Sequence, residues 1–183
     1  MRAQAAIALG LSVAVLSVAM GQPPSATPHS PGDPWAGWRF VLGEWLGGGS
    51  GKPGEGSGSF SFRFDLGEHI LVRRSHTEYP AADERPAVVH DDVMICYPDP
   101  AGGRILAIYF DNEGHVIRYV GDAGEPGRLV LVSEAIWPAP TFRLTYTATG
   151  DDAVTIAFEI APPGHPDAFT PYLTGRAIRQ SRR

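Results

Sequence analysis

The sequence has little that could cross-link it or give it a strong charge. Its 183 residues include one cysteine, Cys96, and one lysine, Lys52. A single cysteine excludes an internal disulfide, so packing has to hold the fold together. Cys96 lies among apolar neighbours and is expected to be a buried, inert thiol. With 20 acidic against 15 basic residues and no basic stripe, nucleic acid is not an expected partner.

The sequence also lacks an apolar run long enough to be a clear membrane span. The run from Ala5 to Ala19 is shorter than the ~20 residues that a spanning helix needs. It follows Met1-Arg2 and ends at small residues, which is the pattern of a secretory signal peptide over residues 1–21. Residues 22–34 are rich in proline and predict an extended linker. The chain is therefore expected to be periplasmic or secreted, without stable membrane insertion after cleavage; an uncleaved anchor is the alternative.

Common catalytic motifs are missing as well. The sequence contains no Gly-x-Ser-x-Gly elbow, no Ser-x-x-Lys, no His-Glu-x-x-His and no His-x-His. The sequence therefore carries none of the best-known motifs of hydrolases and zinc enzymes. These absences leave open acid–base catalysis, which needs only a histidine and a carboxylate within reach of a substrate.

What the sequence does contain is a period-two alternation of apolar and polar residues. Phe60, Phe62 and Phe64 alternate with polar side chains, the pattern of a half-buried strand. Similar segments follow to the end of the chain with short turns between them, and no amphipathic helix of useful length interrupts them. The strands are expected near Trp45 and over residues 59–64, 69–77, 89–97, 104–110, 115–121, 128–133, 141–149, 153–161 and 172–180.

About ten strands joined by hairpin turns predict an all-β fold, a single antiparallel up-and-down β-barrel over residues 35–180. Closure removes the exposed edges that an open sheet of this size would keep; a two-sheet sandwich is the alternative. Residues 38–45 predict a short N-terminal helical turn that leads into the first strand, with Gly43 at the tight connection and Trp45 filling the barrel floor. The glycine- and serine-rich segment from Gly47 to Gly58 predicts a flexible loop between the first two strands.

The segment Leu42-Gly43-Glu44-Trp45, followed by such a meander, resembles the lipocalin-like (calycin) superfamily. In that superfamily a G-x-W sits at the first strand, and an arginine from the last strand packs over the tryptophan. The resemblance implies that Arg176 or Arg179 covers Trp45, a cation–π contact worth up to ~2 kcal/mol.

Within the superfamily, residues from about Phe40 to Arg179 resemble nitrobindin-like barrels and a related set of uncharacterised secreted bacterial β-barrels. Segments 71–77, 90–92, 107–115 and 158–164 carry this resemblance. The resemblance to the uncharacterised secreted β-barrels implies a fold but no established activity. Nitrobindins bind haem through a histidine of the last strand. Tyr172 stands about where that histidine would be; tyrosine can ligate ferric haem, but the departure from histidine counts against a haem cofactor.

The chemistry-bearing residues suggest a ligand pocket in the barrel lumen. Such lumens are mostly apolar, with a few polar groups that orient one small molecule. An inward arginine or histidine needs a partner, because a buried unpaired charge is very costly. The predicted ligand-binding residues are Arg74, His76, His90, Asp92, Tyr109, Phe62, Tyr146 and Tyr172.

The sequence therefore predicts an exported, non-catalytic barrel that binds a small, mostly hydrophobic molecule. One alternative is a hydrolase or isomerase that uses the His90–Asp92 pair together with His76. Others are a ferric-haem protein, a metal site of histidines and carboxylates, and a structural or partner-binding barrel without a pocket. Arg73 or Arg74 could also form ion pairs with Asp91 or Asp92 that merely join neighbouring strands. The sequence does not set the oligomeric state.

Overall fold

A computed structural model describes residues 32–82, 85–122 and 125–181. The predicted signal peptide and most of the predicted linker lie outside these residues. Within the described ranges, no helix is long and apolar enough to span a membrane.

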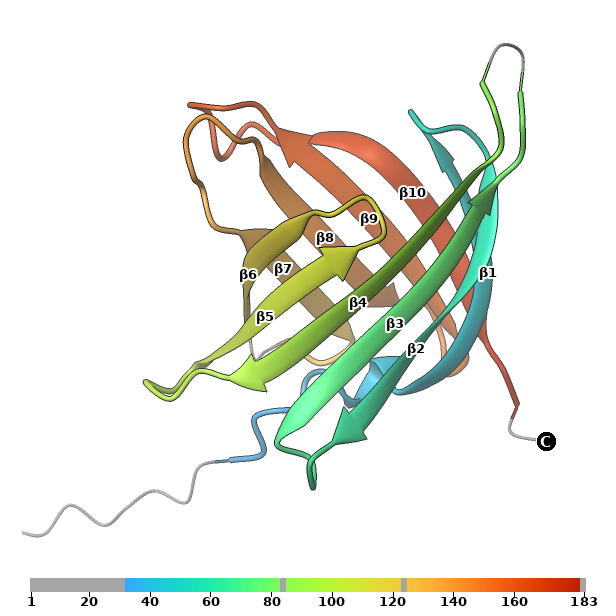
Figure 1. The fold of residues 1–183 in the computed structure, drawn as a ribbon. Coiled ribbons are helices and arrows are strands. Elements are labelled where there is room, and N and C mark those ends of the chain that lie inside the picture. Colours follow the sequence, from blue (N-terminus) through green and yellow to red (C-terminus); the bar gives the residue numbers. More distant parts are fainter. Residues whose placement is uncertain (1–31, 83–84, 123–124, 182–183) are drawn as a thin grey trace, which may run out of the picture. The chain divides into compact units, whose positions relative to one another are not determined.

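The described residues form one 3-10 helix and ten strands, shown in Figure 1. Their bounds are η1 (Arg39–Val41), β1 (Gly43–Gly51), β2 (Gly56–Asp65), β3 (Ile70–Tyr79), β4 (Val88–Pro98), β5 (Arg104–Asp111), β6 (Val116–Asp122), β7 (Arg128–Ser133), β8 (Thr141–Ala148), β9 (Ala153–Ala161) and β10 (Thr170–Arg179).

The strands close into a barrel. Each strand pairs antiparallel with its neighbours in sequence, and β1 also pairs with β10, with Trp45 opposite Arg179 and Gly51 opposite Leu173. The prediction of an all-β, up-and-down barrel that begins with a short helical turn is confirmed. The pairing of the first and last strands rules out the two-sheet alternative.

The expectation of a flexible loop from Gly47 to Gly58 is wrong. Residues up to Gly51 belong to β1, and β2 begins at Gly56. Glycine usually weakens a strand, but it is required where another backbone comes very close. A Cβ on Gly47 would overlap the carbonyl oxygen of Arg176 in β10, and one on Gly58 would overlap that of His76 in β3. The glycines therefore let β1 and β2 coil tightly against their neighbours.

Three buried tryptophans close the end of the barrel at which η1 lies. Trp35, Trp38 and Trp45 are each at most 2% exposed. Their indole Nε1–H groups donate hydrogen bonds to the backbone carbonyl oxygens of Glu68 (2.9 Å), Asp122 (2.6 Å) and Val41 (2.8 Å), respectively. Each ring thus fills core volume and satisfies its polar group at the same time. This end is called the floor below, and the opposite end the rim.

Arg179 of β10 stabilises the floor of the barrel. Its guanidinium carbon lies 4.2 Å from the centroid of the Trp45 ring. The same guanidinium donates hydrogen bonds to the carbonyl oxygens of Phe40 (2.8 Å) and Leu42. The implied arginine over the tryptophan is therefore Arg179, whereas Arg176 is exposed.

Above the floor, side chains fill the barrel. Leu71, Met94, Leu131 and Tyr146 are fully buried in one core cluster. Cys96 is also fully buried, and its burial raises the pKa of the thiol to about 12. The expectation that Cys96 is buried is therefore confirmed.

We predict that Arg179→Met lowers the free energy of unfolding by about 2–4 kcal/mol, because it removes a cation–π contact and two hydrogen bonds to backbone carbonyls. Arg176→Met on the same strand is the matched control and should change it by less than about 0.5 kcal/mol. Urea unfolding followed by tryptophan fluorescence measures both. Equal effects of the two substitutions would contradict this account of the floor.

Candidate functional site: a lumen cavity beneath a polar rim

A cavity of about 110 Å³ lies inside the barrel on the rim side of the core, against β1, β2, β3, β9 and β10. One side of it is apolar, with Phe60, Ile156 and Leu173. The glycines of β1, β2 and β10 contribute only backbone to the wall beside it. The cavity exists because these glycines have no side chains to fill it.

The polar side of the cavity is the inner face of β3. Arg73, Ser75, Thr77 and Tyr79 all line it. They share one face because side-chain direction repeats every two residues in a strand. The row runs from the buried guanidinium of Arg73 to Tyr79 near the rim. It offers a potential ligand hydrogen-bonding groups at several depths.

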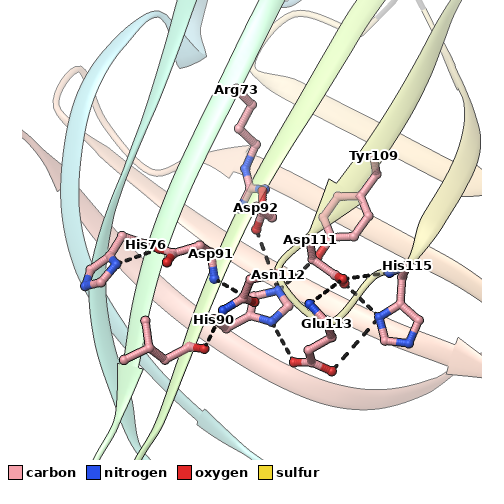
Figure 2. Close-up of polar contacts among 11 residues, drawn as sticks. Arg73, His76, His90, Asp91, Asp92, Tyr109, Asp111, Asn112, Glu113 and His115 are labelled. Carbon is pink, nitrogen blue, oxygen red and sulfur yellow. Dashed lines mark hydrogen bonds and ion pairs between the residues drawn. The ribbon is translucent and has the colours of Figure 1, made fainter.

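Arg73 is buried and paired. Its side chain is 10% exposed, and it forms an ion pair with Asp92 of β4, whose side chain is 4% exposed (Figure 2). Burial alone would lower the pKa of Arg73, but Asp92, together with Tyr146 and Tyr109, raises it above its usual value. Burial raises the pKa of Asp92, and the guanidinium opposes that shift. The pair keeps Arg73 charged inside the barrel, as a buried charge requires.

Two buried polar side-chain atoms lack hydrogen-bond partners among the described residues, and one of them belongs to Arg73, which lines the cavity. They are Nε of Arg73 and the hydroxyl of Tyr146. Burial raises the pKa of Tyr146 to about 12, with Arg73 opposing the shift, so the hydroxyl keeps its proton at neutral pH. Buried groups of this kind are normally satisfied by protein, water or a ligand. Arg73 is thus a lumen group with unused hydrogen-bonding capacity.

A polar network connects this pair to the rim. Nε2 of His90 lies 2.9 Å from the hydroxyl of Tyr109 and 3.8 Å from Oδ2 of Asp92. Its Nδ1 lies 3.0 Å from a carboxylate oxygen of Glu113 in the β5–β6 turn. Burial raises the pKa of Tyr109, so its hydroxyl is neutral. Figure 2 shows these side chains in one chain of contacts from Arg73 to the turn.

The turn itself is held by Asp111. Its carboxylate accepts hydrogen bonds from the backbone N–H groups of Glu113 (3.0 Å) and His115 (2.9 Å), and it lies 2.8 Å from Nδ1 of His115. Burial alone would raise the pKa of Asp111, but these hydrogen bonds lower it below its usual value. Despite the many histidines and carboxylates here, no group of three in the described part of the chain is placed to hold a metal ion.

Arg74 and His76, two of the predicted ligand residues, lie on the outer face of β3. They line a hollow of about 480 Å³ outside the barrel, over β1, β2 and β3. Nδ1 of His76 lies 2.7 Å from Asp91, and Nε2 lies 3.1 Å from Glu78. Hydrogen bonds from the imidazole to these two carboxylates raise the pKa of His76. A ligand role for Arg74 or His76 stays a prediction and would concern this outer surface.

The structure brings some of the other predicted residues together. His90, Asp92 and Tyr109 belong to the polar network, while Phe62 and Tyr146 pack edge to face in the core with ring centroids 5.4 Å apart. Tyr172 sits at the register shift of β10 and packs edge-on against Phe158, at 5.9 Å.

Sequence reasoning did not assign Arg73, Ser75, Thr77 and Tyr79 to the lumen. Both faces of β3 begin with an aliphatic residue, so the first positions do not decide the orientation. A usable signal lies further along: Arg74, His76 and Glu78 alternate with Ser75, Thr77 and Tyr79. A fully charged row is far more costly to bury than a hydroxyl row. The hydroxyl row, with Arg73 at its start, must therefore face inward.

Haem does not fit this lumen. Pockets for drug-sized ligands measure about 300–1,000 Å³, whereas the cavity measures about 110 Å³. The ring of Tyr172, the residue implied as an iron ligand, contacts Phe158 and does not line the cavity. We therefore derive no haem chemistry.

Comparison of the sequence with protein-family models and with curated proteins gives no match. Among solved structures, the fold is similar to that of the S-type phycobiliprotein lyase CPES from Guillardia theta, with a TM-score of 0.53 and 12% sequence identity. The similarity covers 79% of this chain and 90% of that chain. At this identity the comparison shows a lipocalin-like barrel fold and nothing about activity.

We predict that Asp92→Asn lowers the free energy of unfolding by about 3–5 kcal/mol, because it leaves the buried charge of Arg73 uncompensated. Asp91→Asn, one residue earlier on the outer face, should cost less than about 1 kcal/mol, since exposed ion pairs contribute little. Urea unfolding at neutral pH compares the two. A cost for Asp91→Asn as large as that for Asp92→Asn would contradict the assignment of inner and outer faces.

We also predict that His76 titrates above its ordinary pKa of 6.5 and that Asp91→Asn moves its pKa down toward that value. Because the folded-state pKa is raised, the stabilisation from protonated His76 is complete below pH 6.5 and is lost as pH rises through the folded-state pKa. An NMR titration of the imidazole resonances measures this. A wild-type pKa at or below 6.5 would be the contrary result.

Proposed function

We propose that this chain is an exported lipocalin-like barrel that binds, without catalysis, a small and mostly apolar molecule carrying one hydrogen-bond acceptor. The observation that carries the proposal is the cavity beside Arg73, a buried guanidinium whose Nε has no partner among the described residues. The signal-peptide pattern of residues 1–21 supports a periplasmic or secreted location.

The size of the cavity limits the ligand. A water molecule occupies about 30 Å³ in the liquid, so about 110 Å³ holds roughly four groups of that size. A molecule of a few non-hydrogen atoms fits entirely. A longer molecule would place only its head in the cavity and leave its tail at the rim.

The lining sets the ligand's polarity. Phe60, Ile156 and Leu173 offer an apolar surface, and Arg73 offers N–H groups, which can only donate hydrogen bonds. Asp92 already balances the charge of Arg73. The ligand's polar group can therefore be a neutral carbonyl as well as a carboxylate, and Ser75 and Thr77 can donate to the same group.

The barrel fold supports a ligand-binding role but does not identify the ligand. The phycobiliprotein lyase CPES has a similar fold, so a barrel of this kind occurs in a protein that is named as a lyase. With 12% identity, no activity is carried over to this chain.

The catalytic alternative relies on His90 and Asp92. Nε2 of His90 lies 2.9 Å from Tyr109 but 3.8 Å from Asp92, which is too long for a hydrogen bond. Neither residue lines the lumen cavity. This geometry favours a network that holds the strands and the Arg73–Asp92 pair in place over a catalytic pair facing a substrate.

The proposal is tested by NMR titration of the protein with butyrate, butanone and cyclopentane. Butyrate or butanone should shift the backbone resonances of β3 between Arg73 and Tyr79 and bind at least tenfold more tightly than cyclopentane. Thr77→Trp should abolish binding, because the indole fills the cavity. His76→Trp is the matched control, one residue earlier on the outer face, and should leave binding unchanged.

Native mass spectrometry of protein recovered from the periplasm or culture medium complements the titration. A bound small molecule that is lost in Thr77→Trp supports the proposal. Ligand-free protein that also binds none of the three probes contradicts it.

A further inference from the structure

The outward-facing side chains of four consecutive strands, β4 to β7, are mostly apolar. In each strand they alternate with residues that are buried in the lumen. We call this surface the apolar face; it consists of Val93, Ile95, Tyr97, Leu106, Ile108, Phe110, Val116, Val120, Val130 and Val132.

Strand register makes the apolar face continuous. Phe110 of β5 lies between Val93 of β4 and Val116 of β6. In a second row Leu106 lies between Tyr97 and Val120, and Val120 pairs with Val132. Phe110 is 40% exposed and Val116 65% exposed. Contiguous apolar surface of a few hundred Å² is often an interaction site.

The rest of the barrel exterior differs. The outward positions of β2, β8, β9 and β10 carry mainly small or polar residues, including Ser57, Ser59, Ser61, Arg143, Thr147, Thr155, Glu159, Thr174 and Arg176. Strands that are apolar on both faces are typical of sheets covered on both sides. The described residues contain no element that packs over the apolar face, so its cover has to come from outside them.

The size of the apolar face suits the centre of a protein interface. Four strands spaced ~4.8 Å apart, each with about three outward positions ~6.8 Å apart, span about 350 Å² including side-chain width. A standard interface buries about 800 Å² on each partner, with an apolar centre and a polar rim. The face supplies the centre, and the surrounding charged residues supply the rim.

The charges at this face point to a second copy of the chain as the partner. Arg118 of β6 and Glu134, directly after β7, are neighbours, since the backbone N–H of Glu134 donates to the carbonyl of Arg118 at 3.0 Å. Neither side chain has an ion-pair or hydrogen-bond partner among the described residues. A surface with one free charge of each sign is complementary to itself, because a two-fold rotation brings Arg118 of one copy to Glu134 of the other. We infer that two copies of this chain pair through the apolar face.

Sedimentation equilibrium of the full chain, purified after expression with its own leader, tests this inference. The wild-type protein should be a dimer at micromolar concentration. Ile108→Lys should weaken dimerisation at least tenfold, because it buries an unpaired charge at the centre of the interface. Thr155→Lys, an outward position of β9, is the matched control and should leave the dimer unchanged. Circular dichroism confirms that both variants keep their strands.

A charge exchange identifies the second copy as the partner. Arg118→Glu and Glu134→Arg should each weaken the dimer, and combining both substitutions in one chain should restore it. A wild-type protein that stays monomeric at all concentrations overturns the inference, whether the face then binds lipid vesicles or another protein. A dimer that survives Ile108→Lys also overturns it.

Discussion

The structure depends on how closely β1 approaches β10 and how closely β2 approaches β3. The first contact closes the barrel, and both are possible only because Gly47 and Gly58 have no side chain to meet the carbonyl oxygens of Arg176 and His76, respectively. At the floor, Arg179 joins the last strand to Trp45 and to the carbonyls around η1. The same glycines leave the wall beside the cavity without side chains. Closure and the cavity therefore have one cause.

The division of β3 into a charged outer face and a hydroxyl-bearing inner face locates the candidate site. Arg73 is the exception on the inner face, and its burial is balanced by Asp92. That balance rests on a network through His90 and Tyr109 that reaches the β5–β6 turn. The barrel thus holds one charged donor at the inner end of a small, partly apolar cavity. This arrangement suits recognition of an acceptor group more than the chemistry of a catalytic pair.

The sequence is sufficient to predict the class of fold, the closing role of Trp45 and the burial of Cys96, because period-two alternation and turn residues act locally. It misleads at Gly47–Gly58, where composition suggests a loop and only the position of the neighbouring backbones explains the glycines. It also misleads at β3, where Arg74 and His76 are predicted in the lumen but lie on the outer face; Leu71 and Val72 are equally apolar, and only the residues after them distinguish the two faces. The volume of the cavity depends on packing between strands distant in sequence, which no local pattern contains.

The most direct test of the account is a crystal structure of the purified protein soaked with butyrate. The account predicts electron density for a carboxylate within hydrogen-bonding distance of Arg73, in the space between β3 and the glycine-rich wall of β1 and β2. A lumen in which side chains occupy that space, with no room for the soaked molecule beside Arg73, would contradict it.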